Sequence, residues 1–220
     1  MPSMWRGRLA FARHDARHGD VAQLRLWDPR TRRLRSLRHG AMPRGCPYRG
    51  GCRREAKVGS VHALDLGPRL AAFLWMVEAP GVVGHVGYEV RADRLSDGRS
   101  FLAGSGFLGE VCTEGDDTVL PLAPTVAGDR VWFALMRSSC YRNRYSMVRF
   151  DTARRRGLAG PVGGEVLQVV RTGRELVALV APPPNGDVPP SCTPSAPCRL
   201  QRMAAPRLTT PQRRARSPFF

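Results

Sequence analysis

The chain has 220 residues, 42% of them hydrophobic, and a formal net charge of +17 at pH 7. This length suits one folded domain with a substantial core. No apolar run approaches the roughly 18 residues that a membrane-spanning helix needs, so the sequence predicts no membrane span.

The positive charge comes almost entirely from arginine, because Lys57 is the only lysine. Such a balance ordinarily suggests a polyanion such as nucleic acid as a partner. However, the chain is also rich in Gly, Pro, Ala and Val, a composition that GC-rich coding produces without any function. Arg25, Arg91 and Arg149 stand singly at strand positions. We therefore favour a solvated basic surface and keep polyanion binding as an alternative.

The chain start shows no secretion signal, since residues 1–5 are not followed by an apolar segment and a small-residue cleavage site. The first predicted strands begin at Leu9, Gln23 and Arg33. Because so few residues precede Trp5, we expect this first group of strands to be incomplete and to lack its innermost member. We also expect the true start to lie upstream.

A second group of predicted strands covers residues 60–107. It contains an apolar run over residues 70–77, followed by Val86, Tyr88 and Val90, which alternate with polar residues. That alternation is typical of a strand with one face exposed.

Residues 104–109 match G-x-G-x-x-G, the pattern of a dinucleotide-binding turn. Such a site needs a helix that begins at the glycines, so that its amides meet the pyrophosphate. The next residues, 110–115, are few and end in Gly115. We therefore interpret the motif as a flexible connecting loop and predict no cofactor.

The third group, residues 119–162, contains Val131–Met136, a short run without a polar break. Such a run favours a strand that is buried on both faces. A strand over residues 145–151 follows and ends in a tight turn at Asp151.

The fourth group, residues 165–208, contains a predicted hairpin that turns at Thr172–Gly173. Residues 209–220 form a basic tail that we predict to be disordered.

The predicted groups share recurring turns. A glycine turn precedes each apolar run, with separations of roughly 60, 60 and 45 residues, near the period of a propeller blade with insertions. These turns lie at Gly7, Gly67, Gly128 and Gly173. Aromatic-Asp turns close two strands, at Trp27-Asp28 and Phe150-Asp151. On these motifs, the chain from about Trp5 to Leu208 resembles bacterial β-propeller repeats of the WD40 and TolB-like kind.

The resemblance implies an all-β fold of about four propeller-like antiparallel blades in a single domain over residues 1–208. The blades would cover residues 5–45, 60–107, 119–162 and 165–208, as a minimal ring or as part of a larger one. The alternative is a β-sandwich in which the turn spacing is coincidental.

The six cysteines suggest disulfides. Cys46 and Cys52 bracket a short loop, Cys192 and Cys198 bracket another of equal length, and Cys112 and Cys140 form the third possible pair. An even count with matched spacings indicates an oxidising, extracellular or cell-envelope location; reduced thiols would indicate the cytoplasm. Zinc, the second interpretation, usually needs two to four residues between paired thiolates, so we predict no metal. The third interpretation is unpaired buried thiols.

Antiparallel blades place alternate connections on opposite rims. The tight turns gather on one rim, and the long connections with all the cysteines gather on the other, which we predict to be the binding face. Its candidate binding residues are Tyr141, Arg142, Arg144, His62, His85 and Asp117.

We expect a non-catalytic, exported binding module for a protein or a glycan. The first alternative is a hydrolase- or lyase-type propeller enzyme with an acid–base site in the central channel. The second is an Arg-rich polyanion binder. The sequence contains no G-x-S-x-G elbow, no Gly-Lys-Ser/Thr phosphate loop and no H-E-x-x-H.

Overall fold

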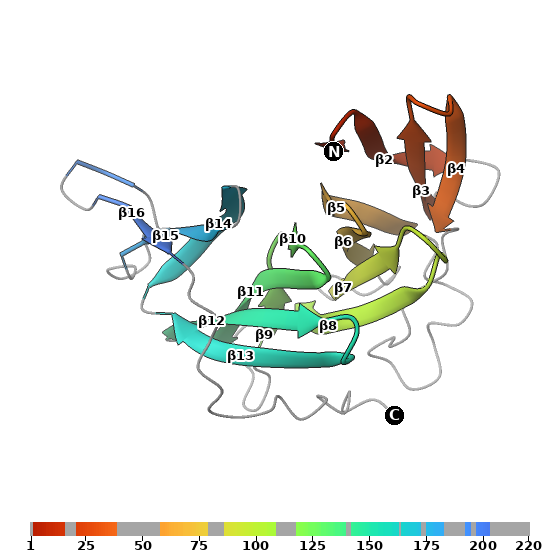
Figure 1. The fold of residues 1–220 in the computed structure, drawn as a ribbon. Coiled ribbons are helices and arrows are strands. Elements are labelled where there is room, and N and C mark those ends of the chain that lie inside the picture. Colours follow the sequence, from red (N-terminus) through yellow and green to blue (C-terminus); the bar gives the residue numbers. More distant parts are fainter. Residues whose placement is uncertain are drawn as a thin grey trace.

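The computed structural model describes residues 2–15, 21–38, 58–78, 86–108, 118–139, 142–162, 164–172, 175–182, 192–194 and 197–202. Its regular structure is entirely antiparallel β-sheet, in sheets that follow one another in chain order as propeller-like blades (Figure 1). The backbone pairing between the second and third sheets consists of one residue pair, Phe107 and Val119. The two sheets therefore count as separate blades. The described residues contain no helix long and apolar enough to cross a bilayer.

The first two sheets have four strands each. The first contains β1 (Ser3–Trp5), β2 (Arg8–Asp15), β3 (Val21–Asp28) and β4 (Arg33–Arg38). The second contains β5 (Val58–Leu66), β6 (Leu70–Glu78), β7 (Val86–Arg94) and β8 (Ser100–Leu108).

The third sheet has an interrupted inner edge, where β9 and β10 pair with different halves of β11. Its strands are β9 (Thr118–Pro121), β10 (Thr125–Ala127), β11 (Arg130–Ser139), β12 (Arg142–Asp151) and β13 (Arg156–Val162). The fourth sheet contains β14 (Glu165–Thr172), β15 (Glu175–Ala181) and β16 (Arg199–Arg202).

The first sheet is incomplete, but in a different way from the one expected. Its innermost strand is present as β1, whose three residues pair with β2 through Ser3 and Ala10, Met4 and Leu9, and Trp5 and Arg8. The corresponding strand of the second sheet, β5, has nine residues. The first blade therefore has an abbreviated inner strand, which corrects the expectation that this strand is missing.

The two middle sheets bury both of their faces. On β6, Phe73 and Trp75 pack with Leu24 of the first sheet, whereas Leu70, Ala72 and Leu74 join a cluster with the third sheet. Stacked sheets that cover both faces of a strand require a continuous apolar run, as in this strand.

The strand β11 has the same arrangement. Val131, Phe133 and Leu135 face the second sheet, and Trp132 and Ala134 pack against the fourth. The prediction that residues 131–136 form a strand buried on both faces is confirmed.

Side chains join the inner strands of neighbouring sheets, because these strands share no backbone ladder with one another. Asp65 on β5 accepts a hydrogen bond from the hydroxyl of Ser3 on β1 (3.3 Å) and another from the backbone amide of Val126 on β10 (2.7 Å). The Ser3 hydroxyl in turn accepts a bond from the amide of Leu66 (2.9 Å). One carboxylate thus connects three sheets.

The series of contacts continues to the fourth sheet and back to the first. The hydroxyl of Thr125 on β10 donates to the carbonyl oxygen of Val169 on β14 (2.7 Å). The guanidinium carbon of Arg171 lies 3.9 Å from the centre of the Trp5 ring on β1, a cation–π contact. Contacts at the inner edge therefore link all four sheets.

The replacement Asp65→Ala is expected to destabilise the fold by about 2 kcal/mol or more, because it leaves the amide of the fully buried Val126 without its acceptor. Urea denaturation measures the loss. The matched control is Asp28→Ala, which removes an exposed acceptor for the amide of Arg30 (3.0 Å) and is expected to cost less than about 1 kcal/mol. Equal losses in the two variants would show that Asp65 does not hold the sheets together.

The glycines at 104 and 106 lie in strand β8, which corrects the interpretation of residues 104–109 as a flexible loop. A Cβ at Gly104 would lie 2.6 Å from the ring of Phe133, and a Cβ at Gly106 would collide with the carbonyl oxygen of Val119. These glycines therefore allow the third sheet to approach the second closely. Because a strand surrounds them, they do not open a nucleotide-binding helix.

The replacement Gly106→Ala is expected to cost about 3 kcal/mol, because the added methyl meets backbone that cannot move as a side chain can. Gly87→Ala is the matched control: it also lies in a strand, nothing lies within 4 Å of the position that its Cβ would take, and the change should be neutral or slightly stabilising. Thermal denaturation of both variants tests the difference. A Gly106→Ala protein as stable as the parent would contradict the close approach of β8 and β9.

Candidate functional site

The tight turns of the first three sheets gather on one rim, which we name the tight-turn rim. It contains the turns at residues 6–7, 29–32, 67–69, 95–99, 128–129 and 152–155. A cavity of about 560 Å³ opens among these turns. It is lined by Arg8, Arg35, Pro68, Arg69, Arg94, Leu95, Ser96, Asp129, Thr152 and Ala153.

Two of the lining arginines come from the first sheet and reach turns of the second. The Nη2 of Arg8, on β2, donates to the carbonyl oxygen of Pro68 (3.2 Å). The Nη2 of Arg35, on β4, donates to the carbonyl oxygen of Leu95 (2.7 Å). These acceptors are neutral, so the bonds position both guanidinium groups without cancelling their charges.

The third arginine connects the second sheet to the third. Arg69 donates from Nη1 to the Oδ2 of Asp129 (2.8 Å), and 71% of its side chain is exposed. The backbone carbonyl of Asp129 accepts a bond from the hydroxyl of Thr152 (2.9 Å). Three turns are thereby held in one arrangement, although the exposed ion pair itself contributes little stability.

The fourth arginine, Arg94, lies at the end of β7. Its guanidinium carbon is 5.0 Å from the centre of the Phe101 ring, and its Nη1 lies 3.1 Å from the Oδ2 of Asp97. A hydrogen bond from the amide of Arg99 lowers the pKa of Asp97, and the charges of Arg94 and Arg99 lower it further. Asp97 is therefore ionised at neutral pH and partly neutralises Arg94.

The pocket as a whole has a positive charge. Four arginines line it, and Asp129 is the only acidic residue among the lining residues. Guanidinium groups have a fixed charge and a planar set of donors that match phosphate, sulfate and carboxylate oxygens. The arrangement suits an anion.

Asp151 shapes one wall of the pocket through the turn that follows it. Its Oδ1 accepts hydrogen bonds from the amides of Ala153 and Arg154, each at 3.0 Å. Burial raises the pKa of the Asp151 carboxyl, but these two amides and the nearby Arg130 lower it by more, so the net pKa is below its ordinary value.

Because the folded-state pKa of Asp151 is depressed, its contribution to stability is complete above the unfolded pKa of about 3.9 and is lost as pH falls through the folded value. Asp151→Ala is expected to cost about 1 kcal/mol at pH 7, and its difference from the parent should shrink between about pH 5 and pH 2. Urea denaturation across this pH range measures both effects. Asp151→Asn can still accept amide bonds but does not titrate, so it separates the turn from the charge. A constant difference for Asp151→Ala down to pH 2 would contradict the assignment.

The structure describes only part of the predicted binding face. His62 is an exposed residue of β5, and its Nε2 lies 2.9 Å from the hydroxyl of Ser60. Arg144 is exposed on β12, where its backbone pairs with Arg137. Arg142 begins β12, and its side chain is outside the described part. His85, Asp117 and Tyr141 lie outside the described residues, so this set of binding residues stays a prediction.

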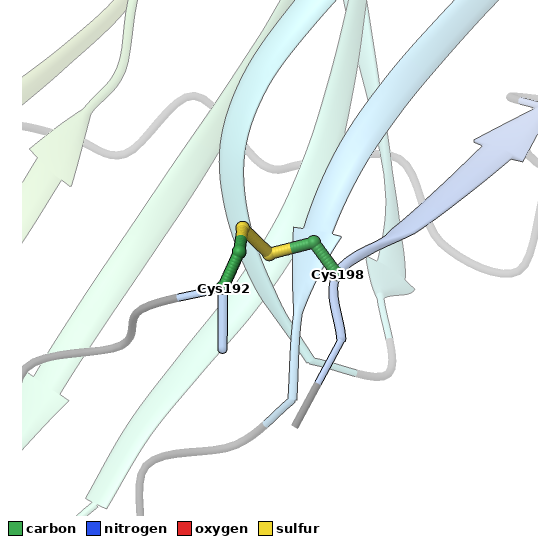
Figure 2. Close-up of a disulfide and its surroundings, with 2 residues drawn as sticks. All are labelled: Cys192 and Cys198. Carbon is green, nitrogen blue, oxygen red and sulfur yellow. A yellow bond between two sulfur atoms is a disulfide. The ribbon is translucent and has the colours of Figure 1, made fainter. Parts of the chain in front are cut away.

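One of the predicted disulfides is present. Cys192 and Cys198 are bonded, with their Cα atoms 5.0 Å apart, and Cys198 immediately precedes β16 (Figure 2). This pair confirms the predicted disulfide, and a disulfide of this kind indicates an oxidising compartment. Cys46, Cys52, Cys112 and Cys140 lie outside the described residues.

In the described ranges, no three His, Cys, Asp or Glu side chains could jointly hold a metal ion. Tyr145 lies buried between the third and fourth sheets and donates to the Sδ of Met136 (3.3 Å). Burial raises the pKa of Tyr145, and the neighbouring Glu165 raises it further. The phenol is therefore a protonated packing group.

The recurring turns of the sequence place arginines on the tight-turn rim, two of which, Arg8 and Arg69, line the pocket. The glycine turns that mark the sheets are followed by arginine: Arg8 follows Gly7, and Arg69 and Arg130 lie two residues after Gly67 and Gly128. These turns lie on one rim. The glycine turns that mark the blades therefore also place several arginines on that rim.

The sequence matches no protein-family model and no curated protein.

Proposed function

We propose that this protein is a non-catalytic binding module that holds an anionic ligand in the arginine-lined pocket of the tight-turn rim. The observation that carries the proposal is the composition of the pocket, with four arginines and one aspartate among its lining residues. A cavity of about 560 Å³ is within the ordinary size of small-ligand sites.

The pocket is organised before any ligand enters. Each guanidinium has five N–H donors, and the bonds to Pro68 and Leu95 engage one donor each of Arg8 and Arg35. Such bonds fix the direction of the side chain, so less conformational entropy is lost on binding. The Arg69–Asp129 pair holds a further guanidinium at the edge of the pocket, with its charge offset by the carboxylate.

Three further arginines of the same rim, which do not line the pocket, adopt a backbone conformation that favours glycine. Arg6, Arg32 and Arg155 have φ of 47°, 52° and 49°, in the left-handed region. A residue with a Cβ is less stable there by about 1 kcal/mol, and glycine would avoid this cost. GC-rich coding supplies glycine as readily as arginine, so composition alone does not account for arginine at these positions.

The class of ligand follows from charge and compartment. The disulfide indicates an oxidising environment, and we propose an extracellular or cell-envelope location. The polyanions available there include sulfated and carboxylated glycans. We therefore propose an anionic glycan as the ligand.

The test is titration of the full chain with a heparin-derived oligosaccharide at several salt concentrations. Arg8→Gln/Arg35→Gln is expected to lower the affinity at least tenfold and to reduce the salt slope of log K by about two. The matched control, Arg137→Gln/Arg144→Gln, removes the same charge from paired positions outside the pocket and should change the affinity less than threefold. Melting temperatures show that both variants are folded.

Equal losses in the two double variants would attribute binding to the overall positive charge and refute the pocket. If Arg137→Gln/Arg144→Gln lost more affinity than Arg8→Gln/Arg35→Gln, the ligand would bind on β11 and β12. These strands carry Arg144, a residue of the binding face that the sequence predicts.

A further inference from the structure

The outer hairpins of the first three sheets have an arginine at the same place, directly after the turn. These residues, which we name the outer arginine row, are Arg33 at the start of β4, Arg99 directly before β8 and Arg156 at the start of β13. All three are exposed. Arg33 pairs in register with Asp28, and Arg156 pairs with Asp151 in the same way. The row therefore repeats with the sheets.

In two of these hairpins the preceding residue is also an arginine. Arg32 and Arg155 have φ of 52° and 49°, and the equivalent residue of the second sheet is Gly98, with φ of 69°. We name the pair Arg32 and Arg33 the first flank, and the pair Arg155 and Arg156 the third flank. All four of these side chains are exposed.

The two flanks keep their charge. The ion pairs in the described part of this rim use other arginines, namely Arg69, Arg94, Arg99 and Arg130. Among the described residues, no carboxylate forms an ion pair with a side chain of either flank. Each flank therefore presents two guanidinium groups to the solvent.

The arginine pocket lies between the two flanks. Arg35, two residues after Arg33 on β4, lines the pocket and donates to the carbonyl oxygen of Leu95 in the turn of the second sheet (2.7 Å). Leu95 and Ala153 also line the pocket, and Ala153 precedes Arg155 by two residues. The pocket is thus continuous with the first flank through β4 and with the third flank through the turn after β12.

The distance across these turns exceeds the size of one anionic group. Stacked sheets pack about 10 Å apart, so the turns of three successive sheets span about 20 Å. A single sulfate or carboxylate group fills only the pocket. A linear polymer with repeated anionic groups reaches the pocket and both flanks at once, and each further contact between arginine and an anion adds affinity and salt dependence.

We infer that the ligand of the arginine pocket is a linear sulfated glycan that crosses the tight-turn rim from the first flank to the third. This inference rests on the proposed function and adds the length and the path of the ligand. The middle of the glycan occupies the pocket, and its two arms contact the flanks. Contact with the ligand also gives Arg32 and Arg155 a use that offsets their backbone cost of about 1 kcal/mol each.

Calorimetric titration of the full chain with a heparin disaccharide and a heparin decasaccharide tests the length. The decasaccharide is expected to bind at least tenfold more tightly than the disaccharide. Its log K should also fall more steeply with log salt concentration, by about one for each further arginine that it engages. Equal affinities and equal salt slopes for the two probes would overturn the extended path.

The path is tested by removing the two charges of one flank at a time. Arg32→Gly/Arg33→Gln and Arg155→Gly/Arg156→Gln should each lower the affinity for the decasaccharide at least fivefold and that for the disaccharide less than twofold. Glycine suits the left-handed backbone at positions 32 and 155, so neither variant should have a lower melting temperature than the parent. A loss of affinity at an unchanged melting temperature is then not a loss of fold.

The matched control is again Arg137→Gln/Arg144→Gln, which removes two charges from paired positions of β11 and β12 outside the pocket and the flanks. It should change the affinity for the decasaccharide less than twofold. A loss as large as that of the flank variants would assign the length dependence to overall charge. A loss in only one flank variant would confine the ligand to two sheets. Either result would overturn the path.

The pocket variant Arg8→Gln/Arg35→Gln separates this inference from the proposed function. If it weakens the binding of both oligosaccharides while the flank variants weaken neither, the pocket binds an anion and the extended path is wrong. If it weakens neither, the pocket itself is refuted, and the path through it with it.

Discussion

The carboxylate of Asp65 is the constraint on which the arrangement of the sheets depends. Strands within a blade are joined by backbone ladders, but the inner strands of different blades have no ladder between them. Asp65 supplies that connection by accepting bonds from Ser3 and Val126, and Thr125 extends it to Val169. Apolar packing between sheets is not directional, so these hydrogen bonds are what fix the position of one inner strand against the next.

This constraint also builds the pocket. Once the inner strands have a fixed order, the turns at their ends must lie close together. The Arg69–Asp129 pair and the Arg8 bond to Pro68 then join the turns of successive sheets. The site is therefore a consequence of how the blades are stacked, and no single turn contains it.

Much of the fold can be predicted because the middle sheets have a local signature. The apolar runs of β6 and β11 arise from burial on both faces, and burial of this kind is visible in a short window. The three-residue β1 escapes prediction because a segment this short shows no periodicity. Gly104 and Gly106 suggest a loop because glycine usually marks one, whereas here they make room for Phe133 and Val119, which are distant in the sequence.

The site is harder to predict for the same physical reason. Its arginines come from consecutive sheets, so only the assembled stack brings them together. In the sequence, the long connections are the more conspicuous candidates because they contain the cysteines and several polar residues. The tight turns look purely structural there, although an arginine follows three of the glycine turns.

Arginine and proline also protect the outer edges of the sheets. The outer strands β4 and β16 begin and end with arginine, at Arg33 and Arg38 and at Arg199 and Arg202. The outer strand β13 contains Pro161, which cannot donate to a ladder. Charge and proline on edge strands disfavour pairing with another chain through the backbone. The outer edges of the first, third and fourth sheets are therefore poor templates for a strand of another chain, and the order of the sheets is left to the contacts made within the chain.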